Sequence, residues 1–333
     1  MASSLDKLPE GNNPLETETV GDRSITLKRK HPSSQPLVSV IMPVHNAEGF
    51  LEEAFDSICN QTYRPLEIAC FNDCSSDKSW QIIQKWQEKF SKADISTVFI
   101  SSDRDTASGP GYGRNQAIQN SHGDYICHLD ADDYMHADRV EAQLNLSQSE
   151  ELKTDDPVLV GSNFVRYPSD STPYYTEWLN QLTTQEMLLQ QYRECTIICP
   201  SWFYPREVYS RVKLMNNVGF VEKDPTLGRV PEDLIFFLDH LILGGGLTKV
   251  ERPLVTYRYV HTSWSIGTKA LDLQRVRIKY LQETVLSQWS SFSIYGGGYD
   301  AKKFINLLST DNAKKVEVFG DIAPKRSVNA LYV

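Results

Sequence analysis

Strand-length apolar runs alternate with helical segments over the first 130 residues or so of the 333-residue chain, and this alternation constrains the fold most strongly. The runs are apolar along most of their length, which is typical of strands buried on both faces, and they lie at 37–44, 66–71, 96–100 and 125–129. Segments with apolar residues at helical spacing separate them, at 47–61, 78–90 and 114–121. The pattern predicts an α/β fold with a mostly parallel sheet flanked by helices, which binds ligands at the carboxyl ends of its strands.

The run at 125–129 ends in the carboxylates of Asp130, Asp132 and Asp133. Acids at the end of a buried strand repel one another and are costly to desolvate unless a positive charge lies among them. Carboxylate oxygens suit Mg²⁺ or Mn²⁺, ions that keep open positions for the phosphates of a substrate. The segment therefore suggests a metal-bridged nucleotide site. An acidic turn with a helix cap is the alternative, because Asp favours both positions.

Loops with polar or glycine-rich sequences follow each of these four strands, at 44–46, 72–77, 109–114 and 130–133. Because the carboxyl ends of parallel strands meet at one edge, we expect these loops to share one rim. Beyond them the alternation is less regular. We expect a strand at 157–165, a helix that begins after Glu232 and Asp233, and a β-hairpin at 247–260.

Composition narrows the choice of partners. A net charge of -9 disfavours bulk binding of nucleic acid, which needs a positive field, but leaves recognition of a single modified nucleoside open. No apolar run has the length of a signal peptide or a membrane span, so we expect no membrane partner and a cytoplasmic location, with the nucleus as the alternative. The six cysteines match no zinc pattern, and we expect them to be reduced.

The chain divides into three predicted regions. Residues 1–36 lack a hydrophobic period and are expected to be a disordered tail. Residues 37–265 form the main domain, and residues 266–333 form a helix followed by a small βαβ-like subdomain. Its glycines at 296–298 match half of a dinucleotide-binding pattern, but one βαβ unit cannot build the sheet that such cofactors need. We therefore expect a small α/β extension without NAD.

Six motifs in this order resemble the family 2 inverting glycosyltransferases with the GT-A fold. They span about residues 38 to 261 and are Pro43-Val44-His45-Asn46, the segment 72–77, Arg114-Asn115, the segment 130–133, Glu232-Asp233 and His261. The C-terminal region departs from the family pattern, so we expect it to be shortened or alternative. The resemblance implies a Rossmann-like GT-A domain that binds a UDP-sugar together with Mn²⁺ or Mg²⁺.

The resemblance also implies roles for the residues that match these motifs. The donor nucleotide and its phosphates would be held by Pro43, Val44, Asn46, Glu48, Asp73, Arg114, Asp130 and Ala131. Asp132 and His261 would hold the metal, although Val260 separates the histidine from the preceding Tyr-Arg-Tyr triplet, where we expect it directly. For Arg114 a solvated surface position is the alternative to clamping phosphate.

The predicted chemistry at the acceptor depends on a second pair of acids. Inversion needs a base that takes the proton of the acceptor hydroxyl, and the resemblance assigns this role to Asp233, with Glu232 positioning it or substituting for it. Trp202 is a candidate for stacking on the sugar or on the acceptor base, with a place in the core as the alternative.

Five further segments resemble the members of the family that galactosylate the nucleoside queuosine in tRNA. They are 44–48, 71–73, 176–183, 230–234 and 254–259. This resemblance implies UDP-galactose as donor and queuosine-bearing tRNA as acceptor, with no obligate protein partner. The alternatives are β-1,3-N-acetylglucosaminyl transfer to a glycan and a non-catalytic protein that binds nucleotide sugars. The presence of both acid pairs argues against the last alternative, because a mere binder needs no base.

Overall fold

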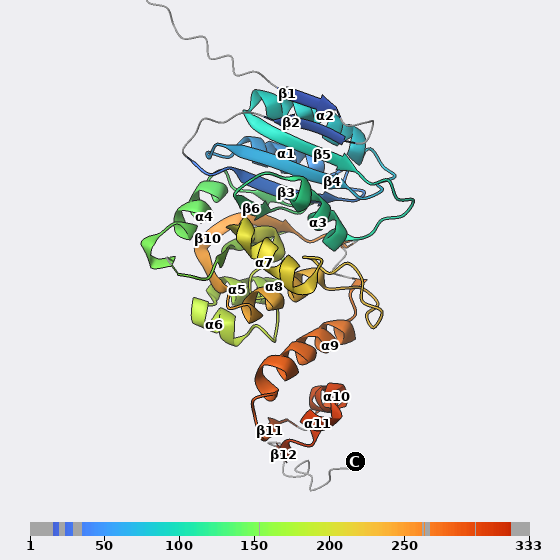
Figure 1. Ribbon diagram of the computed structural model, residues 1–333, viewed down its shortest axis with the longest axis vertical. Helices are drawn as coiled ribbons and strands as arrows, with labels where there is room; N and C mark the ends of the chain where they lie inside the picture. Colours follow the sequence, from blue (N-terminus) through green and yellow to red (C-terminus); the bar gives the residue numbers. More distant parts are fainter. Residues whose placement is uncertain are drawn as a thin grey trace, which may run out of the picture.

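The structure is a computed structural model that describes residues 16–19, 24–28, 35–152, 154–261, 263, 267–296 and 298–320. Its main feature is a ten-stranded sheet with the strand order β1-β2-β5-β4-β3-β6-β9-β8-β10-β7 (Figure 1). The parallel centre consists of β3 (Val38–Val44), β4 (Leu66–Asn72), β5 (Ile95–Ser101) and β6 (Tyr125–His128). The predicted mostly parallel α/β sheet is therefore confirmed.

Side chains of these strands alternate between two apolar cores. On one face, Val40 and Met42 of β3 pack with α1 (Leu51–Cys59), α2 (Ser79–Lys92) and α4 (Arg139–Ser147). On the other face, Ile41 packs in the core that contains α3 (Pro110–Asn120), α7 (Arg206–Asn216) and α8 (Glu232–Ile242). Burial on both faces explains why these strands read as continuous apolar runs.

The remaining strands extend the sheet beyond β6. They are β9 (Phe203–Pro205), β8 (Val158–Tyr167), β10 (Gly246–Arg258) and the short β7 (Tyr134–Met135). Two helices, α5 (Pro173–Gln181) and α6 (Thr184–Leu189), follow β8. The predicted hairpin at 247–260 is wrong, because β10 is one strand that runs parallel to β8. Its register skips residues 251, 252 and 254, so the Pro253 region forms a bulge and not a chain reversal.

The prediction of a disordered tail at 1–36 is wrong for two segments. Strands β1 (Glu16–Thr19) and β2 (Ser24–Lys28) form an antiparallel pair, and β2 adds antiparallel to β5. The segment Ser-Ile-Thr-Leu-Lys at 24–28 alternates polar and apolar residues, and β5 offers it an edge whose backbone groups need partners. The tail prediction at 1–15, 20–23 and 29–34 lies outside the described residues.

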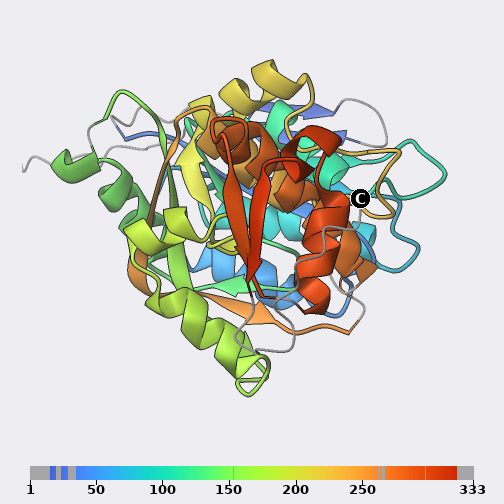
Figure 2. The same ribbon diagram turned by 90° about the horizontal axis from the view of Figure 1, so that it is seen from below.

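The chain leaves the main sheet through α9 (Ala270–Leu281) and a π-helical turn, Gln282–Leu286. A small unit follows, with β11 (Phe292–Tyr295), α10 (Tyr299–Leu307), α11 (Thr310–Ala313) and β12 (Val316–Gly320). Its two strands pair in parallel, as Figure 2 shows from below. The strand, helix and strand expected here are present.

Composition predicted reduced cysteines and no membrane-spanning segment. All six cysteines are free thiols, as predicted. In the part of the chain that the structure describes, no helix combines the length and the apolar character needed to span a bilayer.

Candidate active site

A cavity of about 780 Å³ lies at the carboxyl ends of the parallel strands. Most of the predicted site residues line it, namely Pro43, Val44, Asn46, Asp73, Arg114, Asp130, Ala131, Asp132, Glu232 and Asp233. Three predicted residues, Glu48, Trp202 and His261, are not among its lining residues. The fold therefore brings residues that are up to 190 positions apart (43 to 233) into one site.

One side of the cavity is formed by the ends of β3 and β4. Asp73 is 3 % exposed, and its Oδ2 accepts hydrogen bonds from the backbone N–H groups of Ser108 and Gly109, at 2.7 and 2.8 Å. Its backbone N–H donates to the carbonyl oxygen of Val44. Asn46 adopts a left-handed conformation, with φ of 50°, and its Oδ1 accepts from the N–H of Ser76. Asp73 and Asn46 thus fix the shape of this rim.

Glu48 lies behind this rim. Its Oε2 accepts a hydrogen bond from the backbone N–H of Lys78 at 2.9 Å, and its own N–H donates to Asp77. Asp77 also accepts from the N–H of Ser79 in the first turn of α2. The carboxylate of Glu48, predicted to contact the nucleotide, is therefore used in this structure to join the rim to the start of α2, and it does not line the cavity.

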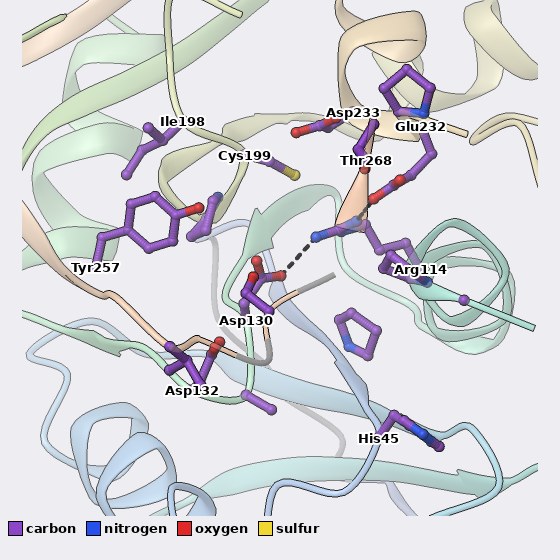
Figure 3. Close-up of a pocket in the computed structure, with 18 of the residues that line it drawn as sticks. His45, Arg114, Asp130, Asp132, Ile198, Cys199, Glu232, Asp233, Tyr257 and Thr268 are labelled. Carbon is purple, nitrogen blue, oxygen red and sulfur yellow. Dashed lines mark hydrogen bonds and ion pairs between the residues drawn. The ribbon is translucent and has the colours of Figure 1, made fainter. Parts of the chain in front are cut away.

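The three acids after β6 have two different environments. Asp130 and Asp132 point into the cavity (Figure 3). Burial, and then the neighbouring Asp130, raise the pKa of Asp132 to about 6. Asp133 is fully buried, and its Oδ1 accepts a hydrogen bond from the backbone N–H of Arg258 at 2.8 Å. Asp133 therefore ties β10 to this turn, while Asp130 and Asp132 face the cavity.

Asp130 and Asp132 fit a divalent cation. Both are carboxylates at one cavity, and a cation beside them would offset the burial and the repulsion by Asp130 that raise the pKa of Asp132. His261 is exposed and packs against the ring of Tyr259 in a separate, more open hollow. Among the described residues no group of three or more metal-ligating side chains comes together. The predicted third ligand is thus not in place, and phosphate or water oxygens would complete the coordination.

Helix α3 begins at Pro110, earlier than the predicted start at Arg114. The glycines of this segment form its first turn and allow close packing. A Cβ on Gly113 would lie 2.8 Å from Cβ of Pro43, and one on Gly111 would lie 3.1 Å from Cβ of Glu232. The first turn of α3 therefore fits between the rim that carries Asn46 and Asp73 and the acid pair Glu232 and Asp233.

Arg114 is buried between two carboxylates. Its Nη2 lies 2.7 Å from Oδ1 of Asp130, and its Nη1 lies 2.5 Å from Oε1 of Glu232 (Figure 3). With 4 % exposure, it is not the solvated surface residue that was the alternative. Because both terminal nitrogens are engaged by acids, its role in this structure is to orient these acids.

Glu232 and Asp233 begin α8. Burial, and then the adjacent Asp233, raise the pKa of Glu232 to about 7. Burial also raises the pKa of Asp233, and the charge of Arg114 opposes this rise. In Figure 3, Asp233 lies near Cys199 and across from Tyr257. A partly desolvated carboxylate with a raised pKa that lines a cavity has the properties of a general base.

Trp202 lies in the core, which rules out the predicted stacking on a ligand. Its exposure is 0 %, and its Nε1 donates to the carbonyl oxygen of Ile197 at 2.9 Å. The rings of Phe220, Phe236 and Phe237 pack around it. Of the two alternatives for Trp202, the structure supports the core position.

The profile of glycosyl transferase family 2 matches residues 39–213, more than half of the chain. The chain belongs to glycosyl transferase family 2. Its sheet and flanking helices have the GT-A arrangement, as predicted, since they resemble solved glycosyltransferases. One is TarS 1-349 of S. aureus in complex with UDP-GlcNAc, with a TM-score of 0.57, 16% identity and coverage of 74% of this chain and 66% of that one. Another is the mannosyltransferase PcManGT of Pyrobaculum calidifontis in complex with GDP-Man and Mn²⁺, with a TM-score of 0.53, 16% identity and coverage of 76% and 65%.

Two relatives of the chain are bacterial glycosyltransferases. The chain is 38% identical over 112 residues to an uncharacterized glycosyltransferase of Haemophilus influenzae, covering 34% of this chain and 42% of the relative. It is 31% identical over 199 residues to the uncharacterized glycosyltransferase EpsJ of Bacillus subtilis, covering 57% and 54%. The chain thus spans about half the length of these relatives.

The residues that form the far wall of the cavity were not predicted from the sequence. The far wall includes Arg166, Tyr175, the segment 194–200 and Tyr257. The guanidinium of Arg166 lies 4.0 Å from the centre of the Tyr257 ring. No motif marks Arg166, Tyr175 or the segment 194–200, and Tyr257 lies in the segment 254–259, to which no role in the site was assigned. The apolar run at 195–200, which lies outside any helical or strand period, is the only signal of a buried loop.

Proposed function

We propose that this protein is a metal-dependent inverting glycosyltransferase that moves a sugar from a UDP-sugar to an acceptor hydroxyl. The observation that carries the proposal is the cavity shared by two acid sets, Asp130 with Asp132 and Glu232 with Asp233, which Arg114 connects. A binding protein needs only the first set. A second set, in which Glu232 is buried and Asp233 partly buried and both have raised pKa values, supports proton transfer.

In the proposed reaction the nucleoside lies along the rim formed by Asn46 and Asp73, and the diphosphate lies at Asp130 and Asp132. The acceptor oxygen attacks C1 of the sugar from the side opposite the diphosphate, and the bond between C1 and the diphosphate oxygen breaks. Asp233 takes the proton of the attacking hydroxyl, and UDP leaves. A bound Mn²⁺ or Mg²⁺ supplies positive charge that stabilises the departing diphosphate.

For the substrates, we propose galactose as the sugar and queuosine in tRNA as the acceptor. The five short segments that resemble the queuosine-specific members of the family support this choice. The far wall is compatible with it, because Tyr257, Tyr175 and Arg166 offer ring and guanidinium faces of the kind that stack on nucleobases.

Transfer of N-acetylglucosamine is the second candidate. It is supported by similarity to TarS of Staphylococcus aureus, a poly(ribitol-phosphate) beta-N-acetylglucosaminyltransferase. That similarity is 29% identity over 105 residues, 31% of this chain and 17% of the relative.

One experiment separates these candidates. The purified protein with Mn²⁺ is offered UDP-galactose, UDP-glucose or UDP-GlcNAc, together with queuosine-bearing tRNA, queuosine-free tRNA, a galactoside or poly(ribitol-phosphate). Digested nucleosides and the other products are analysed by mass spectrometry. A hexose added to queuosine from UDP-galactose alone supports the first candidate, and N-acetylhexosamine on a non-nucleic acceptor supports the second. Absence of transfer to every acceptor would leave a binding protein.

Asp233→Asn tests the assignment of the base. It should lower the transfer rate by about 10²- to 10⁴-fold, the usual contribution of a general base, with the Kd of UDP changed less than about twofold. Asp138→Asn is the control, because Asp138 is an exposed carboxylate that pairs with Arg252 away from the cavity. Loss of UDP binding in the Asp233 variant would show that this residue holds the donor.

A further inference from the structure

Helix α9 connects separate segments that surround Asp233. It runs beside the end of the main domain that carries α8 (Figure 1), and Leu273 of this helix lines the cavity itself, as does Thr268 just before it. Val276 and Tyr280 belong to the same apolar core as α8. Three sets of polar contacts then link α9 to α8, to the loop that leads into Glu232 and to the far wall of the cavity. We call these three elements the acceptor side of the site.

The first contact is with α8. The hydroxyl of Tyr280 donates a hydrogen bond of 2.5 Å to Oδ1 of Asp239, which lies two turns after Glu232. The other oxygen of Asp239 accepts from Asn216 at 3.0 Å. Asp239 is 4 % exposed, so a lost partner would leave a buried carboxylate oxygen without a hydrogen bond. Tyr280 thereby helps to hold the helix that begins with the acid pair.

The second contact is with the loop that leads into Glu232. Oδ2 of Asp272 accepts a hydrogen bond from the backbone N–H of Gly228 at 3.1 Å, and a Cβ on Gly228 would lie 3.2 Å from this oxygen. Arg275 donates to the carbonyl oxygen of Thr226. Asp272 is 2 % exposed, so this contact is shielded from water. The loop is thus held a few residues before the proposed base.

The third contact is with the far wall. Nη2 of Arg277 lies 2.9 Å from Oε2 of Glu194, a residue of the cavity wall. In the π-helical turn just after α9, the hydroxyl of Thr284 lies 2.6 Å from that of Tyr192. The donor side of the cavity, which carries Asp73 and Asp130, is held by elements other than α9. Asp73 is bonded to the segment 108–109 and Asp130 to Arg114 of α3.

We propose that α9 is the positioning element of the acceptor half of the site, with Tyr280, Asp272 and Arg277 holding α8, the 226–231 loop and the 194–200 wall in the geometry that transfer requires. The donor half keeps its geometry without these contacts. This proposal rests on the proposed function for its effect on transfer, but its structural part can be measured independently.

The variants are Tyr280→Phe, which removes one hydroxyl, and Arg277→Gln, with Arg277→Lys as the conservative variant that keeps the charge. Tyr299→Phe is the matched control, because the Tyr299 side chain on α10 is 72% exposed. Amide hydrogen exchange is followed by mass spectrometry in the full chain, and the Kd of UDP with Mn²⁺ is measured by calorimetry. Transfer is assayed with UDP-galactose and queuosine-bearing tRNA.

In Tyr280→Phe and Arg277→Gln, we expect amides of 194–200 and 226–239 to exchange about tenfold faster, because a hydrogen bond to a charged group is lost, buried at Tyr280 and partly buried at Arg277. Amides of 38–46 and 125–132, and the Kd of UDP, should change less than about twofold. KM for the acceptor should rise about tenfold while KM for the donor stays constant, and Arg277→Lys should recover part of this loss.

The proposal is overturned if exchange is unchanged in 194–200 and 226–239, or if the donor segments loosen to the same extent. It is also overturned if donor and acceptor KM rise together. A wild-type protein that transfers nothing would contradict the proposed function only, since the exchange pattern and UDP binding would still decide whether α9 holds the acceptor half. If Tyr280→Phe does not fold, the two Arg277 variants provide the same comparison.

Discussion

Arg114 lies 2.5 Å from Glu232, and these two residues are 118 positions apart in the chain. The same guanidinium lies 2.7 Å from Asp130. One buried cation therefore connects the acid that follows β6 with the acid that begins α8. This contact sets the position of the proposed base relative to the proposed diphosphate site.

Arg114→Met should lower the free energy of unfolding by about 3–5 kcal/mol, because it leaves the buried carboxylate of Glu232 and the partly exposed one of Asp130 without their cation. Urea denaturation gives the value. Arg252→Met is the control, since Arg252 pairs with Asp138 at the surface and should cost at most about 1 kcal/mol. Equal losses in the two variants would show that the Arg114 bridge is as weak as a surface pair.

Transfer should decline as the pH falls, because Asp233 must be deprotonated to accept the proton of the acceptor, and burial raises the pKa of this carboxyl. The pKa of Glu232 is raised to about 7 by burial and by Asp233, and a raised pKa means that the protonated form persists to higher pH. In Glu232→Gln the neighbouring negative charge is absent, so the acidic limb of kcat/KM should move to lower pH. An acidic limb of kcat/KM near pH 4 in the wild type would contradict the raised pKa values of Glu232 and Asp233.

Asp132→Asn should weaken Mn²⁺ binding by at least about tenfold, measured by calorimetry at pH 7.5. In the wild type, Mn²⁺ binding should weaken below pH 6, because the proton competes for a carboxylate whose pKa is raised to about 6. Asp138→Asn should leave the affinity unchanged. An unchanged affinity in Asp132→Asn would place the cation elsewhere.

Trp202→Phe should lower the free energy of unfolding by about 1–3 kcal/mol, because it leaves a cavity and the Ile197 carbonyl loses its indole partner. Transfer per folded molecule should be unchanged, since the ring does not line the cavity. Thermal unfolding and steady-state kinetics check the two parts. A raised acceptor KM at unchanged stability would restore the stacking role.

Much of the donor side could be predicted from sequence because its signals are local. Each parallel strand is a short apolar run, and the polar residues directly after it must lie at the rim, as Asn46, Asp73 and Asp130 do. Errors arose where one local pattern fits two environments. Trp202 is large and apolar enough for a binding wall or for a core, and residues 247–260 contain a break that fits a turn or a bulge.

The α/β class, the parallel centre of the sheet and the acids at its carboxyl edge could be predicted from the sequence, because the hydrophobic period is a property of neighbouring residues. The folded structure was needed to show that Arg114 lies between Asp130 and Glu232, that Asp133 turns inward, and that α9 holds the loop before Asp233. These contacts join segments distant in sequence. Their partners are selected by packing and by the need to pair every buried charge, and no local pattern contains that information.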